Sequence, residues 1–177
     1  MDKKEILKER FKSAISSTVK VIADNSDLKV NFGKSAESKN DSLNLPEIKK
    51  LSSLQDYIDV RAYADSEALK IKYNDKKIFL KNEPRGEIAK NLYAIAEKIR
   101  YEKLGSNKLK GIRSNIIRSY ENKIKNKKNE DISSISNETI AEAFELYLRN
   151  HFFNLKQNTQ TKKTYLTLYV SVLLILY

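Results

Sequence analysis

GEIAKNLYAIAEKIRYEKLGSNKLKGIRSN, residues 86–115, is the stretch that decides the fold. Its apolar residues recur at intervals of three and four, the period of a helix with one buried face. Gly105 tolerates the left-handed conformation that closes many helices, and Lys103 would place a positive charge in the last turn. The sequence therefore predicts a helix that ends at Gly105. Its predicted inner face consists of Ile88, Ala89, Leu92, Ile95, Ala96 and Ile99.

A second helix is predicted to follow directly. Gly111 lies inside its apolar pattern, where glycine costs about 1 kcal/mol relative to alanine. That cost indicates a requirement other than helix propensity, such as close packing. The pattern then dissolves into a lysine- and asparagine-rich segment, which we interpret as a basic hinge at 123–131.

Other segments also have helical periodicity. One covers residues 2–22, and another begins near Ser53 or Gln55. A last helix is expected after a cap at Ser136 or Asn137, with Glu138 in its first turn, where the helix dipole favours negative charge. The short run 78–80 fits a strand or a helix. The last helix has a predicted inner face of Ile140, Ala141, Phe144, Leu148 and His151.

One segment has the two-residue period of a strand. Leu28, Val30 and Phe32 alternate with polar residues, but no partner strand is apparent. Residues 34–44 are polar and without period, which is typical of a mobile loop. The fold expected is mainly α, a helical domain of five to six helices with at most a short strand or hairpin near 28–33.

The composition points to one domain in a reducing compartment. The chain has 177 residues, few glycines and prolines, and no cysteine, so disulfides and thiolate metal sites are excluded. It has no apolar N-terminal signal segment, and we expect a cytoplasmic protein. We place the helical domain at 1–153.

The net charge of +11 leaves two interpretations open. A basic protein suits nucleic acid or acidic protein segments as partners. The lysines are spread over the whole chain, however, whereas a nucleic-acid site requires a localised patch. A solvated basic surface is therefore the favoured interpretation, and a small basic helical nucleic-acid-binding protein is the alternative.

The C-terminal residues 154–177 form a tail of a different kind. A polar segment is followed by the apolar run YLTLYVSVLLILY at 165–177, whose thirteen residues are too few to span a bilayer as a helix, which needs about 20. The run either inserts into a core or a bilayer surface, or derives from a frameshift that truncates the protein.

Motifs for catalysis are lacking. The sequence has neither a glycine-rich phosphate loop nor a dinucleotide-binding fingerprint, and its only histidine is His151. Residues 131–135, DISSI, approach a D-x-S-x-S metal motif but have isoleucine where the last serine is needed. We therefore expect no catalytic, cofactor-binding or metal-binding residue in this chain.

Charged side chains provide one candidate network. Glu97 and Arg100 are three residues apart on one predicted helix, and Glu102 follows a turn and a half after Glu97. Together with residues of another helix they could bind a cation or orient a partner, or they could be ordinary surface ion pairs. The candidate network is Arg61, Asp65, Glu97, Arg100 and Glu102.

Short motifs follow one another along the chain: FKSA at 11–14, Thr18, LKVNFG at 28–33, LP at 45–46, RAYADSEAL at 61–69, and Gly86, Ala89, Tyr93, Glu97, Arg100, Glu102, Gly105, Gly111 and Asn115. This ordered series resembles the N-terminal region of the CobT subunit of the aerobic, ATP-dependent cobaltochelatase. The resemblance covers about Phe11 to Leu148. Ala62 and Tyr63 stand where that family usually has glycine and histidine.

The resemblance implies a role in cobalamin biosynthesis. In that family, CobT forms a chaperone-like ring assembly with CobS, an AAA+ ATPase, and acts with the large CobN subunit. The complex inserts cobalt(II) into hydrogenobyrinic acid a,c-diamide and uses ATP and Mg²⁺. This chain would be an oligomeric adaptor region that binds CobS-like and CobN-like partners, truncated before the von Willebrand factor A-like domain.

Overall fold

The computed structural model describes residues 3–33, 42–48, 51–126 and 136–155. Within these residues the chain is mainly helical, as predicted, with six helices and one small sheet. The segment DISSI at 131–135, which only approaches a metal motif, and the apolar run at 165–177 lie outside the described residues. The elements are α1 (Lys3–Ala23), β1 (Lys29–Phe32), β2 (Ser42–Leu45), α2 (Leu54–Tyr73), α3 (Lys76–Lys81), α4 (Glu87–Lys108), α5 (Lys110–Asn126) and α6 (Asn137–Phe153).

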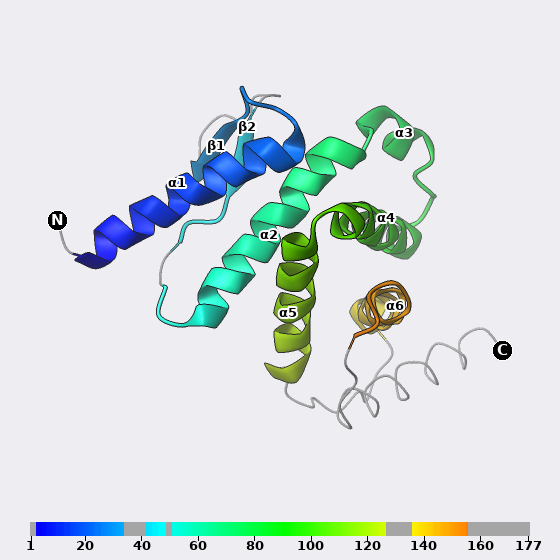
Figure 1. Ribbon diagram of the computed structural model, residues 1–177. Helices are drawn as coiled ribbons and strands as arrows, with labels where there is room; N and C mark the ends of the chain where they lie inside the picture. Colours follow the sequence, from blue (N-terminus) through cyan, green and yellow to red (C-terminus); the bar gives the residue numbers. More distant parts are fainter. Residues whose placement is uncertain (1–2, 34–41, 49–50, 127–135, 156–177) are drawn as a thin grey trace.

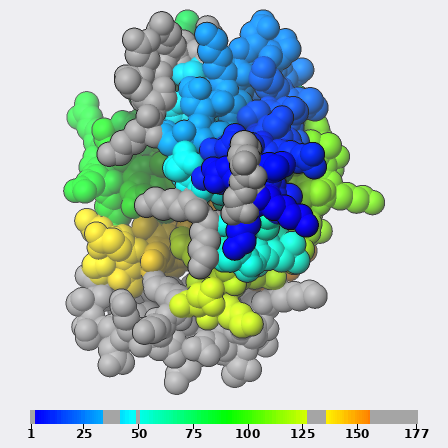
Figure 2. Space-filling view, turned by 90° about the vertical axis from the view of Figure 1, so that its left-hand side faces the viewer, coloured from blue at the N-terminus to red at the C-terminus, as the bar shows by residue number. Residues whose placement is uncertain are grey.

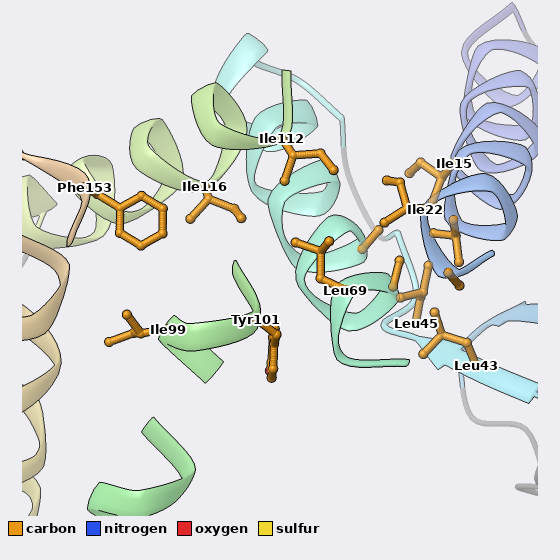
Figure 3. Packing of buried hydrophobic residues seen from close by; sticks show 14 of the residues in the cluster. Ile15, Ile22, Leu43, Leu45, Leu69, Ile99, Tyr101, Ile112, Ile116 and Phe153 are labelled. Atoms are coloured by element: carbon orange, nitrogen blue, oxygen red, sulfur yellow. The ribbon is translucent and has the colours of Figure 1, made fainter. Parts of the chain in front are cut away.

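Helix α2 is the centre of the arrangement. It packs against α1 on one side and against α5 and α4 on the other, while α6 packs on α4 (Figure 1). Helix α1 and the strands cover one side of the molecule (Figure 2). The core runs through all these layers and contains Ile15, Leu45, Leu69, Ile99, Ile116 and Phe153 (Figure 3).

The predicted strand at 28–33 has a partner strand, β2, which lies in a segment of mostly polar composition. β1 and β2 pair in parallel, with Val30 opposite Leu43 and Phe32 opposite Leu45. Both leucines of β2 are buried, so its SLNL sequence is a short alternating strand. The interpretation of 34–44 as a loop is therefore wrong for residues 42–44, and 34–41 lie outside the described residues.

The start of α2 is confirmed at Ser53. Its hydroxyl accepts a hydrogen bond from the backbone N–H of Asp56 at 3.2 Å, and the Asp56 carboxylate accepts one from the backbone N–H of Ser53 at 2.9 Å. This reciprocal pair is a capping box. Residues 78–80, which fitted a strand or a helix, lie in α3, whose N-cap is Asp75.

The predicted roles of the two glycines are wrong. α4 does not end at Gly105 but continues to Lys108, and an added Cβ at Gly105 would lie 2.6 Å from Cδ1 of Leu69. Gly105 is therefore the residue that permits the close crossing of α2 and α4. No atom of the described residues would lie within 4 Å of a Cβ added at Gly111, so close packing among them does not explain that residue.

The burial of α4 differs from its predicted inner face. Ile99 is buried, but the other five predicted residues are half-buried, and the deepest part of the helix is its C-terminal half. The crossing with α2 at Gly105 draws that half into the core. The buried residues of α4 are Ile99, Tyr101, Glu102, Gly105 and Ser106.

The burial of α6 also departs from the prediction, although Ser136 caps it as expected. Ala141 is buried, whereas His151 is exposed and the other three predicted residues are half-buried. The buried face includes the charged residue Arg149, which an apolar pattern cannot reveal. That face consists of Ala141, Ala143, Leu146, Arg149 and Phe153.

The predicted basic hinge at 123–131 begins too early. Helix α5 continues to Asn126, and residues 127–131 lie outside the described residues. Among the described helices, none is both long enough and apolar enough to cross a bilayer.

Candidate functional site

The five residues of the predicted network lie in three separate groups. Glu97 and Arg100 pair with each other, as predicted, and Arg61 pairs with Asp65. Glu102 has a different partner, Arg149 of α6, which was not predicted. No single network therefore unites the five side chains.

The Glu97–Arg100 pair ties α4 to the end of α2. Arg100 donates hydrogen bonds to both carboxylate oxygens of Glu97 at 2.6 Å, and its Nη2 also donates to the carbonyl of Tyr73 at 2.7 Å. Asn74 donates to Glu97 Oε1 at 2.9 Å. The hydrogen bond from Arg100 is the main cause of the lowered pKa of Glu97. This group connects two helices at the surface.

Asp65 is fully buried between α2 and α5. Asn115 Nδ2 donates to its Oδ2 at 3.0 Å, and Arg61 Nη2 lies 2.9 Å from Oδ1. The contact with Arg61 is an ion pair without the alignment of a hydrogen bond, since no donor among the described residues is aligned with Oδ1. Burial raises the pKa of Asp65, against the opposing effects of Asn115 and Arg61. This group connects α2 to α5.

The third group is a buried ionic cluster, which we define as Ser66, Glu102, Glu145 and Arg149. The Ser66 hydroxyl donates to Glu102 Oε1 at 2.5 Å. Arg149 donates from Nη1 to Glu102 Oε2 and from Nε to Glu145 Oε1, each at 2.8 Å. Its guanidinium carbon also lies 4.5 Å from the centre of the Tyr120 ring. The cluster thus joins α2, α4 and α6, and the contact of Arg149 with Tyr120 adds α5.

The electrostatics of the ionic cluster keep its guanidinium charged. Burial disfavours the charged form of Arg149, but the carboxylates of Glu102 and Glu145 outweigh it and raise its pKa. Burial likewise acts to raise the pKa of Glu145, yet Arg149 lowers it overall. The pKa of Tyr120 is raised, first by burial and then by Glu145. One buried cation is therefore held between two carboxylates.

A pocket of about 220 Å³ lies beside the ionic cluster, between α2, α4, α5 and α6. Glu102 and Arg149 form part of its wall, and charged residues of both signs complete it. Such a wall suits a polar side chain of a partner better than an apolar one. Other polar residues of the wall include Tyr63, Glu67, Lys98 and Lys123.

Within the described part of the chain, no three acidic or histidine side chains are grouped as metal ligands. The predicted network could have bound a cation only if its carboxylates lay together. Asp65, Glu97 and Glu102 instead belong to three different groups. The ionic cluster was missed because a charged residue such as Arg149 is expected on the solvated face of a helix. Its i,i+4 spacing from Glu145 was the one visible sign of the pair.

Comparison with known proteins gives one family. Residues 6–166 match the family described as cobalamin biosynthesis protein CobT. The matched region contains every group described above. No solved structure was found to match the chain.

Proposed function

This chain belongs to the CobT family of cobalamin biosynthesis proteins, and we propose that it acts there as the adaptor region of an ATP-dependent cobaltochelatase. Its role in cobalamin biosynthesis follows from the family. The finer proposal is that the chain binds other subunits of the complex, which inserts cobalt(II) into hydrogenobyrinic acid a,c-diamide. The enzyme class proposed for that complex is a ligase that forms a nitrogen–metal bond.

The family match over 6–166 carries the proposal, and the placement of the family motifs supports the adaptor role. Leu69 of the 61–69 motif contacts the position of Gly105, and Asp65 of the same motif binds Asn115. The motif residues are therefore engaged in holding α2, α4 and α5 together. Family motifs that stabilise the packing of helices are what we expect of an adaptor region, which presents its surface to partner subunits.

The proposed partners are a CobS-like AAA+ ATPase and a CobN-like large subunit. In the proposed complex, the ATPase binds ATP and Mg²⁺, and the large subunit binds its substrates, cobalt and the corrin. The pocket beside the ionic cluster is a candidate contact on this chain. Its walls offer hydroxyl, ammonium and carboxylate groups to an inserted polar side chain.

Co-purification tests this proposal directly. The chain would be expressed with a tagged CobS-like or CobN-like subunit from the same source, and the eluted complex analysed by size-exclusion chromatography. We expect a stable complex with at least one subunit and faster cobalt insertion when the chain is added to the reconstituted mixture. Absence of association in both pairings would overturn the proposal.

Nucleic-acid binding is the alternative from another class, and the charge of +11 motivates it. The same preparation would be titrated with duplex DNA at 50 and 200 mM salt. A DNA-binding protein that makes several phosphate contacts loses affinity by orders of magnitude over this range. Tight, steeply salt-dependent binding without subunit association would favour the alternative.

A further inference from the structure

Helix α3 presents large apolar side chains to solvent. Ile78 is 59% exposed and Leu80 is 57% exposed, although the helix has only six residues. Ile71, near the end of α2, is 40% exposed. Isolated exposed apolar residues are common, but two so close on one short helix form a feature that needs an explanation.

The attachment of α3 to the rest of the molecule leaves these side chains uncovered. Phe79, between them in sequence, stacks on Tyr93 of α4 with ring centres 4.8 Å apart and planes inclined by 23°. Its neighbours do not share this contact, and α3 packs less extensively on other elements than the long helices do. The helix lies at a corner of the molecule (Figure 1).

The charge around α3 has one predominant sign. Residues 70–82 contain five lysines and one acidic residue, Asp75. The carboxylate of Asp75 accepts hydrogen bonds from the backbone N–H groups of Lys77 and Ile78 at 2.8 and 3.1 Å, so it serves as the helix cap. Ile78 and Leu80 are therefore accompanied by exposed cations, which are Lys70, Lys76, Lys77 and Lys81, whereas Lys72 pairs with Asp24 at 3.5 Å.

We propose that α3 is a docking surface for an acidic segment with apolar side chains on a partner subunit of the complex. The inference rests on the proposed function and specifies which surface the partner uses. An apolar centre with a charged rim is the usual anatomy of a protein interface. The lysines select an acidic partner and speed its encounter, and burial of Ile78 and Leu80 supplies affinity.

A protein partner fits this surface better than a membrane or a nucleic acid does. Helices that lie on membranes have a long apolar face with a large buried area, which a six-residue helix does not provide. Nucleic-acid contacts are made mainly by cationic and polar groups to phosphates. Two exposed aliphatic side chains would contribute little to such contacts.

Three variants of the full chain test the proposal against the co-purified partner subunits. Ile78→Gln with Leu80→Gln removes the apolar centre while keeping residues of good helix propensity. The second variant reverses the charge of three lysines on the rim, by Lys76→Glu, Lys77→Glu and Lys81→Glu. The matched control reverses three exposed cations on α5, with the same change in net charge: Lys110→Glu, Arg118→Glu and Lys125→Glu.

We expect the first two variants to weaken subunit binding by about tenfold or more, while the control stays within about threefold of wild type. Circular dichroism should show the same helix content in all four proteins. The salt dependence of wild-type binding should diminish in the α3 charge variant.

Wild-type affinity in both α3 variants would overturn the inference and leave the proposed function standing. Failure of the wild-type chain to bind either subunit would overturn both. Vesicles with anionic lipids and duplex DNA serve as further probes. Binding to either that is lost in the α3 variants, with subunit binding unchanged, would assign the surface to that ligand instead.

Discussion

Replacement of Gly105 by alanine tests the helix crossing at the centre of the fold. The new Cβ would lie 2.6 Å from Cδ1 and 2.9 Å from Cγ of Leu69, both closer than real Cβ contacts allow. Leu69 is 1% exposed, so its side chain has no solvent into which it can move. Either α2 and α4 must separate or the Leu69 side chain must change its conformation.

The expected loss of stability follows from two opposing effects. Overpacking a core costs about 1–3 kcal/mol, and Gly→Ala inside a helix gains about 1 kcal/mol. The clash involves three carbons of a buried residue, Cδ1, Cδ2 and Cγ of Leu69, and its cost falls in the upper part of the first range. We therefore expect Gly105→Ala to lower the free energy of unfolding by about 1–2 kcal/mol, with a lower urea midpoint at unchanged slope.

Gly111→Ala is the matched control, because its added Cβ meets nothing within 4 Å. It should raise the free energy of unfolding by up to about 1 kcal/mol, so the two substitutions have opposite signs. In the double variant with Leu69→Ala, the Gly105→Ala penalty should shrink, since the shortened side chain removes the clash. Equal stabilisation by both glycine substitutions would refute the close-crossing argument.

Two further predictions concern the buried charges. Arg149→Met should lower the free energy of unfolding by about 3–5 kcal/mol, because it leaves Glu102 and Glu145 buried without their cation. Arg100→Met, at a half-exposed ion pair, should lower it by about 1 kcal/mol or less. Equal losses for the two variants in urea unfolding would contradict this reasoning. Burial raises the pKa of Asp65, so the folded state binds its proton more tightly than the unfolded state does. Stability relative to Asp65→Asn should therefore decrease as pH rises from the ordinary aspartate pKa, about 3.9, through the raised one. A pH-independent difference would show that Asp65 does not titrate differently on folding.

Periodicity and capping predicted the helices because those properties are local. The three- and four-residue spacing located the helices, and Ser53 was one of the two starts considered for α2, the other being Gln55. Glu97 and Arg100 were also predictable, since residues three apart on a helix are neighbours. These features depend on nearby residues in the chain.

The remaining features depend on which helices meet, which periodicity does not specify. Gly105 looks like a helix end in sequence, yet in the fold it lies opposite Leu69. Arg149 looks like a residue of the solvated face until Glu102 is found 2.8 Å away. β2 was missed because a strand of four residues within a polar segment has too few apolar positions to stand out.

The family motif residues stabilise the fold, whereas the surface proposed to bind a partner, α3, lies outside these motifs. Asp65, Leu69 and Gly105 are engaged by contacts between helices, so substitutions there act on folding first. Helix α3 lies between the 61–69 motif and the motif that begins at Gly86, and its exposed side chains have no such internal role. Motif variants should therefore lose subunit binding together with helix content, whereas α3 variants should lose binding with helix content intact. Loss of helix content in the α3 variants would place α3 in the scaffold as well.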